Sequence, residues 1–225
     1  MLYSPVGTLL WSYFLVYVLV GFVFNWSIKF LLSSNIGEIL SVFTGMLLSW
    51  ESPLCATQLL WVNLITDSLP ALSLGVDPVN KDIMSKPPRN PRDGIFKNMW
   101  LSIALEGCII GMLSVIAYCA GRIVAPDNPA VSRTMSFSVL ALSQLFHAFN
   151  MRSEKSVLNA ELVRNRFLVM SLAVGILLQI CVVNIPILSD IFKTTPLSLR
   201  EWGIVMLLSV MPLIIVELQK LFSRK

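Results

Sequence analysis

Two groups of polar side chains interrupt apolar stretches of this sequence, and their ligand atoms are all oxygens. The first lies in FLLSSNIGEILSVF (30–43), where Asn35 and Glu38 are three residues apart and share one helix face. The second lies in WVNLITDSLP (61–70), where Asn63, Thr66 and Asp67 are spaced i, i+3 and i+4. Neither group contains a Lys or Arg beside its carboxylate. Two acids with amide and hydroxyl oxygens, and no basic partner close by, predict a cation site.

The ligand types narrow the choice of cation. Hard cations prefer oxygen, and Ca²⁺ takes about six to eight oxygens from carboxylates, amides and carbonyls. Pro70 has no N–H, so the carbonyl of Thr66 loses its helical partner and local unwinding is favoured. Transporters bind ions at such interrupted helices. Gln144 would add a further oxygen from a later stretch. The alternative interpretation is that Glu38 and Asp67 are structural carboxylates hydrogen-bonded between helices.

The composition places these groups in a membrane. Of the 225 residues, 56% are hydrophobic and 13% are charged, whereas about a quarter of the residues in soluble domains are charged. A soluble protein of this size could not bury so much apolar surface. The formal net charge of +4 is too modest to indicate a nucleic-acid partner. The four cysteines form no CxxC pair and are interpreted as small buried hydrophobes. We predict an all-α polytopic transmembrane helix bundle, whose first partner is the lipid bilayer.

Seven stretches approach the roughly 20 apolar residues that a bilayer core requires. They are Thr8–Phe24, Ile28–Leu48, Thr57–Val76, Trp100–Ala120, Thr134–Asn150, Phe167–Leu188 and Trp202–Leu218. The first two are separated by only three residues. They either form a tight hairpin, which is the favoured interpretation, or one long helix. Residues 1–24 are therefore an extra apolar leader, and residues 25–225 form the main membrane domain with six spans.

The basic residues predict the orientation of the chain. Residues 77–99, 151–166 and the tail after 218 hold five, four and three of the 17 Lys and Arg residues. Six spans that start at Ile28 place these three segments on one side. The positive-inside rule makes that side cytoplasmic, together with the C-terminus. The protein is expected to be an integral, multi-pass membrane protein.

Several other residues have structural interpretations. Glu106 and Glu217 lie near span ends and are interpreted as structural carboxylates that reach the interface. His147, the only His in the chain, is interpreted as a packed or interfacial side chain. Gly107 and Gly111 form a GxxxG pattern, which allows another helix to approach closely, although accidental spacing is nearly as good an explanation.

The polar groups and their surroundings also resemble a known family. The run WVNLITDSLPALSLGVDPVNKDIMSKPPRNPRDGIF (61–96), preceded by FLLSSNIGEILSVF (30–43), resembles the fifth and sixth transmembrane helices of type II P-type cation pumps. Calcium-transporting members, particularly bacterial ones, are the most similar. The resemblance covers about residues 25–225, the last six of ten pump helices. Beyond residue 100 it depends mainly on hydropathy, Gln144 and the stretch HAFNMRSE (147–154).

The resemblance implies roles for the polar residues. Asn35 and Glu38 would be ion ligands on the fifth pump helix, and Asn63, Thr66 and Asp67 on the sixth, with Asp67 bridging two sites. Gln144 lies where sarcoplasmic-reticulum-type calcium pumps have Glu, which leaves the number of ions per cycle open. The transported ion implied is Ca²⁺, in a bacterial plasma membrane. The fourth span would be the seventh pump helix, packed against the fifth.

The sequence contains neither a DKTGT phosphorylation motif nor an actuator TGE motif. The chain is therefore expected not to hydrolyse ATP alone, and ATP and Mg²⁺ would act only through domains outside it. Its partners would be a cation and the remaining part of a P-type ATPase. The alternative is a stand-alone membrane protein that binds cations passively or regulates a full-length pump.

Overall fold

The computed structural model describes residues 27–50, 54–76, 99–151 and 165–222, which are helical and contain no strand. The first described helix is Ser27–Leu47. The others, in chain order, are α2 (Ala56–Trp61), the π-helical turn η1 (Val62–Thr66), α3 (Ser68–Gly75), α4 (Trp100–Val124), α5 (Pro129–Met151), α6 (Arg166–Asn184), α7 (Pro186–Phe192) and α8 (Leu199–Phe222). The predicted all-α membrane bundle is confirmed for these residues. The apolar leader 1–24 lies outside them.

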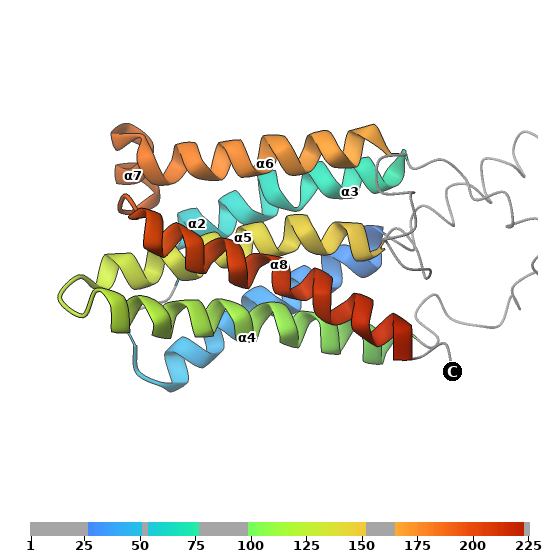
Figure 1. Ribbon diagram of the computed structural model, residues 1–225, viewed down its shortest axis with the longest axis horizontal. Coiled ribbons are helices and arrows are strands. Elements are labelled where there is room, and N and C mark those ends of the chain that lie inside the picture. Colours follow the sequence, from blue (N-terminus) through green and yellow to red (C-terminus); the bar gives the residue numbers. More distant parts are fainter. Residues whose placement is uncertain (1–26, 51–53, 77–98, 152–164, 223–225) are drawn as a thin grey trace, which may run out of the picture.

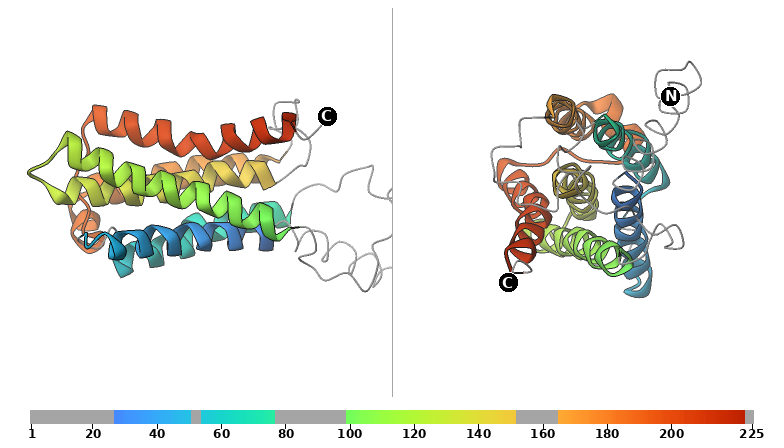
Figure 2. Two further views of the ribbon diagram at one scale, coloured as in Figure 1. Left: turned by 90° about the horizontal axis from the view of Figure 1, so that it is seen from below. Right: turned by 90° about the vertical axis from the view of Figure 1, so that its right-hand side faces the viewer.

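Helix α5 is the centre of the bundle. Viewed end-on in Figure 2, it is surrounded by the Ser27–Leu47 helix, α3, α4, α6 and α8. Nineteen of its 23 residues are buried, including four serines, Gln144 and His147. A polar helix is stable at this position because its hydroxyl and amide groups find partners on neighbouring helices. One example is the contact of 2.9 Å between the hydroxyl oxygens of Ser114 and Ser136.

Four helices are long and apolar enough to cross a membrane. They are Ser27–Leu47, Trp100–Val124, Arg166–Asn184 and Leu199–Lys220. The remaining two predicted spans correspond to α5 and to the α2–η1–α3 segment, which are helical over similar lengths but carry more polar residues. These two segments bring Asn63, Thr66, Asp67 and Gln144 into the bundle.

Several predicted span boundaries differ from the structure: α4 continues to Val124 and α5 begins at Pro129, and two further boundaries have a clear local cause. The span predicted to end at Leu188 ends at Asn184, because Pro186 disfavours helical geometry at Ile185, whose backbone is extended. The span predicted to begin at Trp202 begins at Leu199. There the Ser198 N–H donates to Glu201 Oε2 at 2.6 Å, and the Glu201 N–H donates to Ser198 Oγ at 3.4 Å. This reciprocal capping box fixes the first turn of α8.

The GxxxG pattern of α4 lies at a close helix contact, as the resemblance implied. A Cβ atom placed on Gly107 would lie 2.6 Å from Ile36 Cγ2 and 2.8 Å from the Ser33 carbonyl oxygen. A Cβ atom on Gly111 would lie 3.0 Å from the Gly37 carbonyl oxygen. The small residues therefore allow α4 and the Ser27–Leu47 helix to touch along their backbones.

The helix ends that join the basic segments lie together at one end of the bundle. Figure 1 shows the ends of α3, α5 and α8 and the starts of α4 and α6 at its right-hand end. The opposite end holds the α4–α5 turn and α7. Residues 77–98 and 152–164 themselves lie outside the described residues. The shared end agrees with the predicted grouping of the basic segments, and its cytoplasmic location stays a prediction.

Candidate cation site

The predicted span that holds Asn63, Thr66 and Asp67 is one helical segment, α2–η1–α3, interrupted by a π-helical turn. Within η1, the Asp67 N–H donates to the Val62 carbonyl, five residues earlier, at 2.9 Å. The local unwinding predicted from Pro70 is thus a widened turn that stays helical. A π turn inserts one extra residue before Pro70, changes which side chains face α5, and occurs often at functional sites.

The Glu38 carboxylate, on the Ser27–Leu47 helix, accepts hydrogen bonds from side chains of η1 and α5. Its Oε2 accepts from Asn63 Nδ2 at 2.8 Å, and its Oε1 accepts from Gln144 Nε2 at 3.3 Å. Thr66 Oγ1 donates to the Val62 carbonyl at 2.7 Å and lies 3.5 Å from Gln144 Oε1. Glu38, Thr66 and Gln144 are all buried. The structure thus brings together residues that are up to 106 positions apart in sequence.

Asp67 is the residue of this site without hydrogen-bond partners. It is 1% exposed, and neither of its carboxylate oxygens has a hydrogen-bond partner in the part of the chain that the structure describes. The Ser34 hydroxyl is near enough to Asp67 to be a weak donor, but the two side chains do not reach hydrogen-bond geometry, and the charge of Glu38 acts on Asp67 as well. Two carboxylates in one low-dielectric region repel each other when both are ionised. A cation between them would remove that repulsion and supply the missing partner for Asp67.

The two asparagines differ from the other candidates. Asn63 is exposed on the side of the bundle, and Asn35 is half-buried. The side chain of Asn35 makes no hydrogen bond to any described residue, so the structure does not join it to the contacts around Glu38. The site therefore has a buried wall formed by Thr66, Asp67 and Gln144 and an open side at the asparagines.

The side chains of this site are suited to a cation that binds carboxylate, amide and hydroxyl oxygens. Among the described residues, no three His, Cys, Asp or Glu side chains gather as a metal cluster. Glu38 and Asp67 are the only acids of this site, so further ligands must be hydroxyl, amide or carbonyl oxygens. The amide groups of Asn63 and Gln144 point their nitrogen atoms at Glu38. Rotation about the last side-chain bond would present their oxygens instead.

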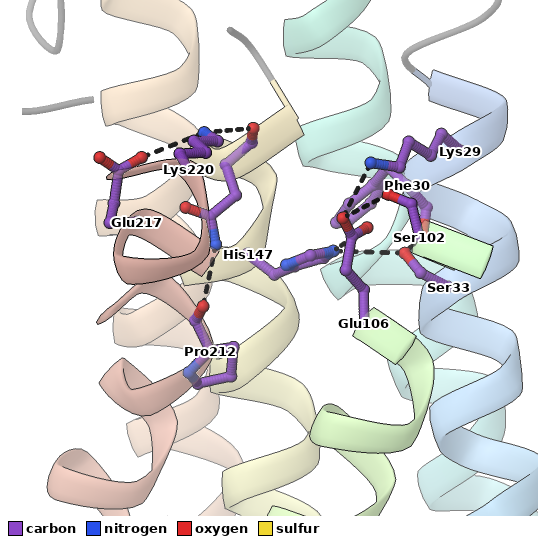
Figure 3. A network of polar contacts seen from close by, with 10 residues as sticks. Lys29, Phe30, Ser33, Ser102, Glu106, His147, Pro212, Glu217 and Lys220 are labelled. Carbon is purple, nitrogen blue, oxygen red and sulfur yellow. Dashed lines mark hydrogen bonds and ion pairs between the residues drawn. The ribbon is translucent and has the colours of Figure 1, made fainter. Parts of the chain in front are cut away.

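A second buried polar network, which was not predicted from the sequence, lies beside this site. Figure 3 shows Glu106 between Lys29 and His147. Lys29 Nζ lies 2.8 Å from Glu106 Oε1, and His147 Nε2 lies 3.5 Å from Glu106 Oε2. The hydroxyl of Ser102 donates to Glu106 Oε1 at 3.1 Å, and Ser33 Oγ lies 3.3 Å from His147 Nε2. Glu106 is thus buried in an ion-pair network that joins three helices and is not an interfacial carboxylate.

The signal for this network was present in the sequence. Lys29 and Ser33, like Ser102 and Glu106, are four residues apart and share a helix face. What the sequence did not contain was the packing of the two faces against each other and against α5. His147 is fully buried, as the packed interpretation expected.

The same end of α5 is also tied to α8. Asn150 Nδ2 donates to the Pro212 carbonyl at 3.1 Å, and Lys220 Nζ donates to the Asn150 carbonyl at 3.1 Å (Figure 3). Lys220 also pairs with Glu217 at 3.0 Å. A cationic side chain is favourable at the carbonyl end of a helix. Glu217 therefore has a structural role as the partner of Lys220, whose ammonium group joins α8 to the end of α5, and this agrees with its sequence interpretation.

The arrangement of the helices and of the polar site agrees with a comparison of the sequence with protein families. Residues 51–222 match the family model described as "Cation transporting ATPase, C-terminus". The chain belongs to this family.

Two curated members of the cation-transporting ATPases show how much of a pump this sequence represents. "Calcium-transporting ATPase 1" of Bacillus cereus is 43% identical over 214 residues, and the match covers 88% of this chain and 24% of that protein. "Calcium-transporting ATPase" of Bacillus subtilis is 38% identical over 186 residues, covering 82% of this chain and 21% of that protein. The chain thus spans between a fifth and a quarter of the length of these relatives.

Proposed function

We propose that this chain binds and translocates Ca²⁺ as the C-terminal membrane domain of a P-type ATPase. The cation passes between the Ser27–Leu47 helix, η1 and α5. Glu38 and Asp67 provide the negative charge, and Asn63, Thr66 and Gln144 provide neutral oxygens. Asn35 is a further ligand when the open side of the site is covered. Both Bacillus relatives are named as calcium-transporting ATPases, which supports Ca²⁺ as the ion.

This proposal depends on one observation: Asp67 is buried, and neither of its carboxylate oxygens accepts a hydrogen bond from the described residues. A buried carboxylate without partners costs several kcal/mol, on the order of the penalty for moving an ion out of water. A purely structural carboxylate would be expected to have hydrogen bonds from neighbouring amides, as Glu38 does. Asp67 therefore fits a cation ligand better than an interhelical hydrogen-bond acceptor.

The exposed position of Asn63 explains how this chain relates to a complete pump. A polar amide that faces lipid is unfavourable, so this side is expected to pack against further helices in the assembled protein. The relatives are four to five times longer than the aligned region, which gives room for such helices. ATP hydrolysis, with its Mg²⁺, would take place in the other parts of the pump. The C-terminus is expected on the cytoplasmic side of the plasma membrane.

The test replaces Asp67 with Asn in a complete pump that carries this sequence as its C-terminal membrane region. Asp67→Asn keeps the shape and removes the charge, so the Ca²⁺ concentration for half-maximal phosphorylation should rise at least about tenfold, the factor for each 1.4 kcal/mol of lost binding. Asp190→Asn is the matched control, because Asp190 is exposed on α7. An unchanged Ca²⁺ dependence in the Asp67 variant would contradict the assignment.

The stand-alone alternative is tested with the chain by itself. Purified chain in liposomes should give no Ca²⁺ flux above that of protein-free liposomes, because alternating access needs the rest of the pump. A Ca²⁺ leak that Asp67→Asn abolishes would favour the passive function instead.

A further inference from the structure

The surface between α3 and α6 has a groove that the proposed cation site does not use. It has a volume of about 310 Å³ and is lined by Leu69, Leu72, Ser73, Val76, Phe167, Met170, Ser171 and Val174. The two helices lie side by side (Figure 1), and hydrogen bonds join them at one end. There Asn165 Nδ2 donates to the Ser73 carbonyl at 2.8 Å, and Ser73 Oγ lies 3.2 Å from the Phe167 carbonyl.

The groove is expected to lie in the hydrocarbon region of a bilayer. Helix α6 has the highest hydropathy of the four candidate spans, 2.3, and only 33% of that span is buried. Leu72, Phe167 and Met170 are at least 60% exposed around the groove. In a membrane, side chains exposed in this way contact lipid, and a hollow between two apolar helices is the size of a small-molecule pocket. An acyl chain fits this chemistry.

Two polar features indicate which lipid it is. The Ser171 hydroxyl lies on the groove, is buried, and has no hydrogen-bond partner among the described residues. Arg166 begins α6, is exposed, and makes no side-chain hydrogen bond or ion pair with any described residue. Five residues separate the two, which corresponds to about 7.5 Å along a helix. Arg166 does not line the groove, but it lies one helical turn before Met170, which does, on the same face of α6. A cation at headgroup level and a hydroxyl donor below it would match the phosphate and the ester groups of a phospholipid.

The sequence adds positive charge at the same end. Helix α3 runs into residues 77–99, which hold five basic residues, and α6 follows residues 151–166, which hold four including Arg166. Basic clusters beside membrane helices attract anionic headgroups, and basic sites between such helices bind them specifically. We propose that the α3–α6 groove binds one anionic phospholipid. Its acyl chain lies between Leu72 and Met170, Ser171 donates to an ester carbonyl, and Arg166 pairs with the phosphate.

This lipid site does not depend on the proposed cation transport. The test uses the purified full chain in detergent, native mass spectrometry, and phosphatidylglycerol or phosphatidylcholine as the added probe. The chain should retain one phosphatidylglycerol in preference to phosphatidylcholine. Arg166→Gln should reduce this preference about fivefold, the effect of one basic side chain at an anionic surface. Arg200→Gln is the control, because Arg200 is exposed in the first turn of α8, at the other end of the bundle.

A second pair of variants separates the groove from general lipid contact. Met170→Trp fills the groove and should abolish retention. Leu177→Trp, two turns along α6, is matched because both residues are 60% exposed and only Met170 lines the groove. Val174→Trp, also in the groove, replaces Met170→Trp if that variant does not fold. Three results would overturn the proposal. The Leu177 variant could lose as much bound phosphatidylglycerol as the Met170 variant, or the chain could retain the two lipids equally. Co-expression of the remaining part of a relative's pump could also displace the lipid.

Discussion

At the scale of single residues, this domain places its charged groups in two neighbouring buried sites with opposite character. Among the described residues, the carboxylates of Glu38 and Asp67 have no basic partner, whereas Glu106 is balanced by Lys29 and lies against His147. Lys29 and Glu38 belong to the same helix, nine residues apart. We therefore propose a bound cation only at the first site, because the second site already contains the charged amine of Lys29.

The Lys29–Glu106 pair gives a test at this scale. Removing one partner of a buried ion pair leaves an unpaired charge and destabilises by about 3–5 kcal/mol. Lys29→Met and Glu106→Gln should each lower the unfolding free energy of the chain in micelles, by less than that range, because Lys29 is 13% exposed. The exchange Lys29→Glu with Glu106→Lys should recover part of the loss. If the exchanged protein is no more stable than the summed effects of Lys29→Glu alone and Glu106→Lys alone predict, the pair is not coupled.

At the scale of elements, the π turn η1 distinguishes the α2–η1–α3 segment, which holds Thr66 and Asp67 of the candidate cation site, from an ordinary span. The sequence predicted a break near Pro70, and the structure shows its form as a widened turn that brings Thr66 and Asp67 into the bundle. Helices α2 and α3 on either side are both attached to the α6–α7 region. Trp61 Nε1 donates to Gln179 Oε1 at 3.1 Å, and Asn165 Nδ2 bonds to Ser73. The π turn lies between these two attachments.

Pro70→Ala tests the role of the π turn. The variant regains the N–H that a regular α-helix would donate to the Thr66 carbonyl, so the regular register becomes more favourable. The stability of the chain should rise by roughly 1 kcal/mol, less than the ~3 kcal/mol typical of Pro in a helix interior. The Ca²⁺ affinity of the complete pump should fall, because Thr66 and Asp67 rotate away from Gln144. A rise in stability with no change in affinity would separate the turn from ion binding.

The glycine contact between α4 and the Ser27–Leu47 helix gives a second test at this scale. Gly107→Ala places a methyl group 2.6 Å from Ile36 Cγ2 and 2.8 Å from a backbone oxygen, so it should destabilise the chain by about 1–3 kcal/mol. Gly203→Ala is the matched control in α8, because a Cβ atom there meets nothing within 4 Å. That control should be neutral or stabilise by up to about 1 kcal/mol. The test compares the melting temperatures of the two variants in the same detergent. Equal melting temperatures would show that the close contact at Gly107 does not contribute to stability.

At the scale of the whole molecule, the bundle is a polar helix enclosed by apolar ones, with one side still open at Asn63. The basic segments 77–99, 151–166 and the tail all join the bundle at the end shown on the right of Figure 1. This arrangement is consistent with an even number of membrane-spanning helices between one basic segment and the next.

The orientation gives a prediction for the intact chain. The positive-inside rule places the C-terminus in the cytoplasm, so a green fluorescent protein fused after residue 225 should fluoresce in a bacterial host, and alkaline phosphatase fused there should be inactive. Fusion of the two reporters after Asp127, in the α4–α5 turn, is the control and should give the reverse pattern. Active phosphatase at the C-terminus would overturn the assignment of sides.

The sequence determined the elements because their signals are local. Apolar stretches of membrane length, the cluster at Asn63, Thr66 and Asp67, and the GxxxG pattern can each be found within a few helical turns. Their membrane setting and the family followed from those patterns. The interruption of the helix near Pro70 could also be predicted from the sequence, because the missing backbone N–H is a property of one residue.

Only the tertiary structure decided which polar groups have partners. Whether a buried carboxylate is satisfied depends on which faces of distant helices meet, and sequence spacing contains no information about that contact. For this reason Glu106, expected at the interface, is enclosed by Lys29 and His147, and Asn35, expected beside Glu38, has no such contact. The same packing leaves Asp67 buried with both oxygens free of hydrogen bonds from described residues, and this is the physical reason for the cation that we propose there.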